Sequence, residues 1–63
     1  MEFNEQIKRL RKENNLTQEE MAKKLNVTRQ ALSNWENNRN LPDFEMIILI
    51  AKTFGVSLDE LIL

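Results

Sequence analysis

Residues 17–36, TQEEMAKKLNVTRQALSNWE, carry the strongest structural signal in the chain. Apolar residues recur at helical spacing over 18–25 and again over 29–37, which predicts two helices. Asn26 tolerates the left-handed backbone of a helix end, and Thr28 can cap the helix that follows. Only about three residues then separate the two helices, too few for a comfortable antiparallel pair. The sequence therefore predicts the steep crossing of a helix-turn-helix.

Helix start and stop signals confirm the first of these helices and predict three more outside the stretch 17–36. Thr17 and Glu20 have the spacing of a capping box, as do Ser57 and Glu60. Gly55 is a natural helix stop. Because no segment shows the alternation of a strand, we expect an all-α fold, a compact five-helix bundle in one domain of residues 1–63. The expected helices cover about residues 4–13, 18–25, 29–37, 43–54 and 58–63.

The helix from Thr28 to Asn37 divides into two faces at about 100° per residue. The core arc contains Ala31, Leu32 and Trp35. The opposite arc, called the polar face below, consists of Arg29, Gln30, Ser33, Asn34 and Asn37. Guanidinium and carboxamide groups match the edges of guanine and adenine in the major groove. The alternative is an ordinary solvated face, but such faces favour Glu and Lys, which are better helix formers than Ser and Asn. We therefore expect the helix 28–37 to enter the major groove and read base sequence.

Residues around this helix are candidates for phosphate contacts. Gln18 begins the preceding helix and can donate to a phosphate oxygen, although it could equally be a simple helix former. The amide groups at the N-terminus of the helix after Thr28 attract a phosphate. Asn37, Asn38 and Arg39 can add contacts from the loop; alternatively, Arg39 is a mobile surface charge.

Arg11 and Glu36 lie at the edges of the core arcs of their helices, where each would be poorly solvated alone. We expect them to form a structural salt bridge that positions the reading helix without contacting DNA. The alternative is two independent exposed charges. Phe44 is expected in the core or at its rim, as are Phe3 and Phe54.

The composition excludes several classes of site. The chain has no Cys and no His, which removes disulfides, thiolate metal sites and the commonest general base. It also lacks a glycine-rich phosphate loop, and Asp59 and Glu60 are better explained as first-turn residues of a helix. We therefore expect no enzyme activity, cofactor, metal or small-molecule substrate. Since no apolar run approaches about 18 residues, we expect no membrane segment and a cytoplasmic, nucleoid-associated protein.

The charges are unevenly distributed along the chain. The net charge of −1 does not suggest a nucleic-acid partner. However, residues 1–40 contain eight basic and six acidic side chains, a net charge of +2, whereas residues 41–63 contain one basic and four acidic, a net charge of −3. The basic part contains the predicted reading helix.

Excess apolar residues toward the C-terminus predict a second surface. A homodimer interface is expected at Met46, Leu49, Leu58 and Ile62. The rival hypothesis is that this surface makes the chain a protein-interaction module without DNA binding. The ending Leu61-Ile62-Leu63 also suggests a fragment of a longer protein, or a last helix covered by a partner.

The segments 18–22 and 27–36 resemble the helix-turn-helix domains of phage repressors and Cro proteins in bacterial transcriptional regulators. The likeness continues through Arg39, Leu41-Pro42, Ile47, Ile50-Ala51, Phe54 to Ser57 and Leu61. It implies a lambda-repressor-like domain that binds a palindromic operator in double-stranded DNA, usually as a homodimer. It also implies phosphate or base contacts at Gln18, Thr28, Arg29, Gln30, Ser33, Asn34 and Asn37, and the Arg11–Glu36 salt bridge. We expect a repressor rather than an activator, because repression needs only occupancy of a promoter.

Overall fold

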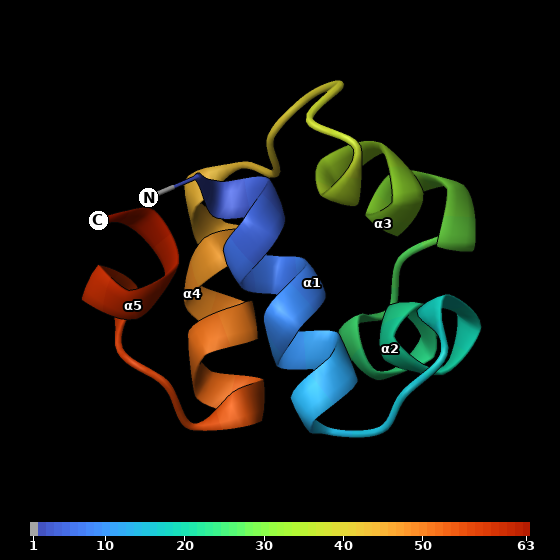
Figure 1. The fold of residues 1–63 in the computed structure, drawn as a ribbon, viewed down its shortest axis with the longest axis horizontal. Coiled ribbons are helices and arrows are strands. Elements are labelled where there is room, and N and C mark those ends of the chain that lie inside the picture. Colours follow the sequence, from blue (N-terminus) through green and yellow to red (C-terminus); the bar gives the residue numbers. More distant parts are fainter. Residues whose placement is uncertain (1) are drawn as a thin grey trace.

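The computed structural model describes residues 2–63, which form five α-helices and no strand. The all-α prediction is therefore confirmed for this part of the chain. The first helix begins one residue earlier than expected, and the third ends at Glu36, with Asn37 as its C-cap. The helices are α1 (Phe3–Glu13), α2 (Gln18–Leu25), α3 (Arg29–Glu36), α4 (Phe44–Phe54) and α5 (Leu58–Ile62), shown in Figure 1.

Side-chain caps fix where four of the helices begin. At α2 the capping box is complete: Glu20 N–H donates to Thr17 Oγ1 at 3.0 Å, and Thr17 N–H donates to Glu20 Oε1 at 2.8 Å. At α5 only half of the expected box forms: Ser57 Oγ accepts from Glu60 N–H at 3.1 Å. Within residues 2–63 there is no second bond in which Ser57 N–H donates to the Glu60 carboxylate. Thr28 and Asp43 cap α3 and α4. These caps satisfy backbone N–H groups that would otherwise lack a partner.

The core lies between helix α1 and the two helix pairs that flank it, α2 with α3 and α4 with α5. Figure 1 shows α1 running through the middle, with α2 and α3 on one side and α4 and α5 on the other. Helix α1 contacts α3 and α5, while α2 bridges α3 and α4. The buried apolar residues are Ile7, Leu10, Met21, Ala22, Leu25, Leu32, Trp35, Ile50, Ala51 and Leu61. In this arrangement one side of α3 packs in the core, and its opposite side faces the solvent.

Two expectations about apolar residues were wrong in part. Phe44 is 61% exposed rather than in the core. It is the first residue of α4, and Cα–Cβ bonds in a helix tilt toward the N-terminus, so its ring projects beyond the packed body. Ala31 is only half-buried, although Leu32 and Trp35 are buried as predicted. Within the described residues, each helix is too short or too polar to cross a bilayer.

Candidate nucleic-acid interface

The turn between α2 and α3 sets the direction of α3. Asn26 adopts left-handed backbone, with φ 58° and ψ 41°, as the sequence predicted. Val27 N–H donates to Ala22 O at 2.9 Å, and the Val27 side chain packs against the core. Thr28 returns to extended backbone and accepts a bond from Ala31 N–H at 3.0 Å. The chain therefore changes direction within three residues and starts α3 across α2.

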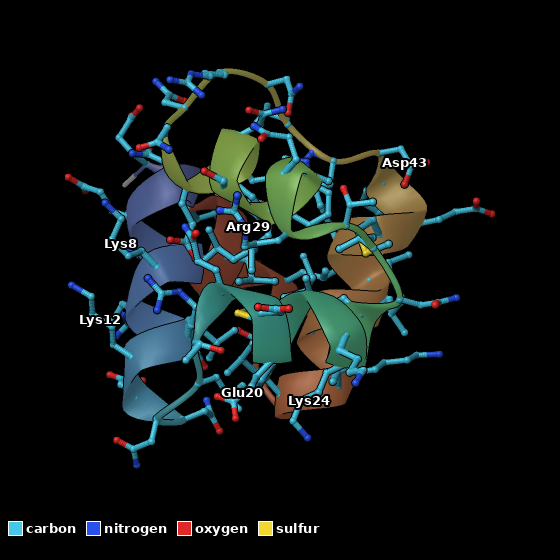
Figure 2. All side chains as sticks on the ribbon, turned by 90° about the vertical axis from the view of Figure 1, so that its right-hand side faces the viewer. Lys8, Lys12, Glu20, Lys24, Arg29 and Asp43 are labelled. Carbon is cyan, nitrogen blue, oxygen red and sulfur yellow. The ribbon has the colours of Figure 1, made fainter. Side chains whose placement is uncertain are left out.

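The polar face lies on the outward side of α3. Arg29, Gln30 and Asn37 are exposed, whereas Ser33 and Asn34 are half-buried. Figure 2 views the domain from the side of α2 and α3, and places Arg29 close to where the two helices meet. Because Leu32 and Trp35 anchor the opposite side of the same helix, the polar face has a fixed orientation relative to the core.

Hydrogen bonds pair most of the side chains on the polar face. Gln30 Nε2 donates to Asn34 Oδ1 at 3.1 Å, one helical turn away. Asn37 Nδ2 donates both to Ser33 O at 2.9 Å and to Ser33 Oγ at 3.2 Å. These side chains are therefore partly ordered without a ligand, which lowers the entropy that binding would have to remove.

Gln18 connects the start of α2 with both ends of α3. Its Nε2 donates to Glu36 Oε1 at 3.1 Å, and its Oε1 accepts from Arg29 Nη1 at 3.4 Å. A primary amide has two N–H donors, so one remains for the phosphate contact expected from the sequence. No local sequence pattern predicts this bridge, because the partners lie 18 and 11 residues away and meet only where the helices cross.

Arg11 and Glu36 form the ion pair expected from the sequence. Arg11 Nε lies 2.7 Å from Glu36 Oε2, and Arg11 Nη2 donates to Glu36 Oε1 at 3.1 Å. Arg11 Nη1 also donates to Leu16 O at 3.1 Å, so this guanidinium joins α1, the α1–α2 loop and α3. Glu36 is only 2% exposed.

The ion pair shifts the titration of Arg11. The hydrogen bond to Glu36 raises the pKa of Arg11, aided by the charge of that carboxylate and opposed by burial. A folded-state pKa above the unfolded value stabilises the fold at every pH below the ordinary arginine pKa. The contribution of Arg11 is therefore fully present at neutral pH, and would be lost only as the pH rises through the folded pKa.

The loop after α3 presents the remaining candidates. Asn38 has a left-handed φ of 59°, and its N–H donates to Trp35 O at 3.3 Å. Arg39 N–H donates to Asn34 O at 2.9 Å. The side chains of Asn38 and Arg39 are exposed, as is Thr28 at the opposite end of α3. The backbone is thus held by the helix while the side chains remain accessible.

Two lysines of α1 were not singled out in the sequence. Figure 2 places Lys8 and Lys12 along one edge of the side formed by α2 and α3. Their spacing of four residues, which puts both on one side of a helix, was the available signal. Figure 2 thus shows three basic side chains, Arg29, Lys8 and Lys12, on this side of the domain.

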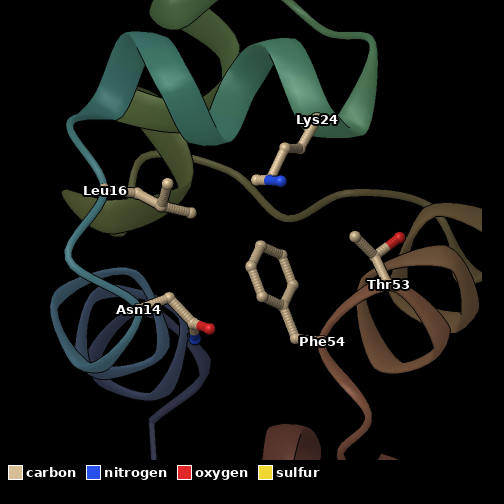
Figure 3. A pocket seen from close by; sticks show the side chains of 5 residues that line it. All are labelled: Asn14, Leu16, Lys24, Thr53 and Phe54. Carbon is tan, nitrogen blue, oxygen red and sulfur yellow. The ribbon is translucent and has the colours of Figure 1, made fainter.

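A hollow of about 360 Å³ lies between α2 and the ends of α1 and α4, shown in Figure 3. It is lined by Asn14, Leu16, Lys24, Thr53 and Phe54. Lys24 and Phe54 point toward one another across it. None of the lining residues belongs to α3, so the hollow is separate from the polar face.

Comparisons with known proteins agree with this geometry. Residues 7–61 match the helix-turn-helix family. The chain is 47% identical over 62 residues to the HTH-type transcriptional activator BcrR of Enterococcus faecalis, covering 98% of this chain and 30% of that protein. It is 42% identical over 60 residues to the HTH-type transcriptional regulator YqaE of Bacillus subtilis, covering 95% of this chain and 52% of that protein.

A third relative is matched over most of its own length. The HTH-type transcriptional regulator MJ0272 of Methanocaldococcus jannaschii is 40% identical over 55 residues, covering 87% of this chain and 83% of that protein. No solved structure gives a significant match. The chain thus spans about half or less of the first two relatives and most of the third. It belongs to the helix-turn-helix family of transcriptional regulators, as a domain of the phage repressor and Cro type.

Proposed function

We propose that this chain binds double-stranded DNA at specific sequences, with α3 in the major groove. The observation that carries the proposal is the polar face: Arg29, Gln30 and Asn34 turn outward from a helix whose other side is locked by buried Leu32 and Trp35. Guanidinium and amide groups at the start of a helix are suited to base edges. The residues proposed to hold phosphates are Asn37, at the C-terminal end of the polar face, and its neighbours Gln18, Thr28, Asn38 and Arg39.

Selection of bound sites from random duplex DNA tests this proposal. We expect a conserved motif, with affinity for the selected site at least about a thousandfold above that for random DNA. Measuring both affinities by fluorescence anisotropy at the same salt concentration separates specific binding from charge attraction. Equal affinities for selected and random duplexes would reject sequence-specific binding and favour the protein-interaction alternative.

Arg39 is proposed to contact a phosphate, and its replacement gives a distinct signature. Arg39→Ala should weaken binding to cognate and random DNA alike, and reduce the slope of log affinity against log salt by about one unit. The residue is exposed and makes no side-chain hydrogen bond within residues 2–63, so the fold should be unaffected. A loss confined to the cognate site would mean that Arg39 reads bases instead.

We propose that the domain forms a homodimer on a palindromic site. Leu49 and Ile62 are 40% and 44% exposed, which supports their place in the interface. Met46 and Leu58 are half-buried against the core, so only part of each side chain would be free to contact a partner. An exposed apolar surface on α4 and α5, away from α3, would let two copies pair while both polar faces stay free for DNA.

The substitution Ile62→Asp tests the homodimer. It should lower affinity for an inverted repeat by about a hundredfold, because two linked domains bind with the avidity of both. Affinity for a duplex carrying one half-site serves as the control and should not change. Equal losses on the two duplexes would show that Ile62 acts on the fold and not on dimer formation.

We also propose repression as the regulatory outcome, exerted in the cytoplasm at the nucleoid, where operator DNA would be found. Occupancy of a promoter is sufficient for repression, whereas activation requires an additional contact with the transcription machinery. The relative BcrR is named as an activator, so the test must detect either a decrease or an increase in transcription. A reporter placed downstream of the selected site should show lower expression when the chain is present. Higher expression would contradict repression and indicate activation instead.

A further inference from the structure

Two charged neighbours fix the orientation of the Gln18 side-chain amide. A carboxylate only accepts hydrogen bonds, and a guanidinium only donates them. Gln18 Nε2 donates to Glu36 Oε1 at 3.1 Å, and Gln18 Oε1 accepts from Arg29 Nη1 at 3.4 Å. Turning the amide over would place its N–H groups against the guanidinium and its oxygen against the carboxylate. Both contacts therefore favour the same one of the two amide orientations.

Glu36 is the stronger of these two anchors. Its side chain is 2% exposed, and Arg11 holds both carboxylate oxygens, with Nε at 2.7 Å from Oε2 and Nη2 at 3.1 Å from Oε1. The contact between Gln18 and Arg29 is longer and lies at the surface. A bond to a buried, fixed carboxylate is less screened by water, and its acceptor needs no further ordering. Glu36 thus holds the amide, and Arg29 supports the same orientation.

Arg11 allows a carboxylate to lie beside a phosphate contact. An unpaired negative charge next to Gln18 would repel the phosphate to which this residue is proposed to donate. The Arg11 guanidinium neutralises the Glu36 carboxylate. Because a carboxylate oxygen has more than one lone pair, Glu36 Oε1 accepts from Arg11 Nη2 and still accepts from Gln18 Nε2.

We propose that Glu36 is a positioning residue for DNA binding, because it holds the Gln18 amide with one N–H of Nε2 ready for a phosphate. Nε2 carries two N–H groups, and within residues 2–63 only one of them is used. Gln18 is also the first residue of α2, where the backbone N–H groups favour an anion. Resting on the proposed function, this inference makes the buried ion pair part of the interface as well as of the fold.

A double-mutant cycle on DNA affinity tests the inference. Gln18→Met removes the amide, whereas Arg11→Met with Glu36→Leu removes the anchor without leaving a buried unpaired charge. Alone, Gln18→Met should lower affinity for the selected duplex about tenfold, through loss of a bond to a charged phosphate. In the background without the anchor it should cost about threefold or less, because a free amide must first be ordered. Fluorescence anisotropy measures the affinities, at a temperature where circular dichroism shows every variant folded.

Arg39→Ala is the matched control. Arg39 is also proposed to hold a phosphate, but Glu36 bonds only to Arg11 and Gln18 within residues 2–63. The cost of Arg39→Ala should therefore be the same with and without the anchor. Equal costs of Gln18→Met in the two backgrounds would overturn the inference. So would a drop in the cost of Arg39→Ala as large as that for Gln18→Met.

A second measurement uses the unchanged protein and does not depend on how the variants fold. The NMR order parameter of the Gln18 side-chain N–H groups, recorded without DNA, should lie above about 0.6, below which an N–H group is flexible. A flexible Gln18 amide would overturn the inference even if the domain bound DNA as proposed. Equal affinity for selected and random duplexes would instead reject sequence-specific binding, whatever the order of this amide.

Discussion

Replacing Arg11 with methionine is expected to lower the free energy of unfolding by about 3–5 kcal/mol. The substitution leaves the Glu36 carboxylate, 2% exposed, with only the Gln18 amide as a partner, and deprives Leu16 O of its donor. A chain of 63 residues has a typical free energy of unfolding of about 3–9 kcal/mol. The variant should therefore lose at least about a third of its stability. Urea titration followed by circular dichroism would measure the loss.

Arg9→Met provides the matched control on the same helix. Arg9 Nη1 lies 3.8 Å from Glu13 Oε2, with both side chains more than half exposed, and Arg9 Nη2 donates to Gln6 Oε1 at 2.7 Å. The loss should therefore be about 0.5–1.5 kcal/mol, well below that of Arg11→Met. The double change Arg11→Met with Glu36→Leu should recover most of the stability, because an apolar pair removes the buried unpaired charge. If Arg9→Met destabilised the domain as much as Arg11→Met, burial of the ion pair would not be the cause.

The parts of the fold that the sequence predicted depend on local interactions. Thr17 and Thr28 cap helices through bonds to residues three positions later, and Asn26 reverses the chain by its own backbone preference. Such signals need no knowledge of the rest of the molecule. The division of α3 into Leu32 and Trp35 on one side and the polar face on the other follows from helical periodicity alone.

The features that could not be predicted from the sequence depend on how the helices pack against one another. Periodicity shows which side of α4 and α5 is apolar, but not how far a neighbouring helix covers it. The pattern predicts Phe44 in the core or at its rim, whereas its side chain is 61% exposed. It predicts Met46 and Leu58 at an interface, and both are half-buried against the core. The bridge from Gln18 to Glu36 and Arg29 likewise exists only because α2 and α3 cross steeply.

Leu32→Ala is expected to lower the free energy of unfolding by about 2–5 kcal/mol. Leu32 is fully buried in the core on the side of α3 opposite to the polar face, so alanine leaves a cavity. Leu49→Ala makes the same chemical change in another helix at a residue that is 40% exposed. It should cost about 1 kcal/mol or less. Similar losses in the two variants, measured by urea titration at low protein concentration, would contradict the assignment of the core.

The same variant separates folding from recognition. Because the polar face shares no side chain with the core, Leu32→Ala should weaken DNA binding only by reducing the folded fraction. An excluded osmolyte such as trimethylamine N-oxide, which strengthens burial, should then restore its affinity for the selected site. Gln30→Met should also bind the selected site more weakly, because it removes a proposed base contact. The osmolyte should not restore its affinity, since Gln30 is exposed and its replacement does not reduce stability. If Leu32→Ala binds weakly even when circular dichroism shows it to be folded, Leu32 also sets the position of α3 on DNA, and core and polar face do not act independently.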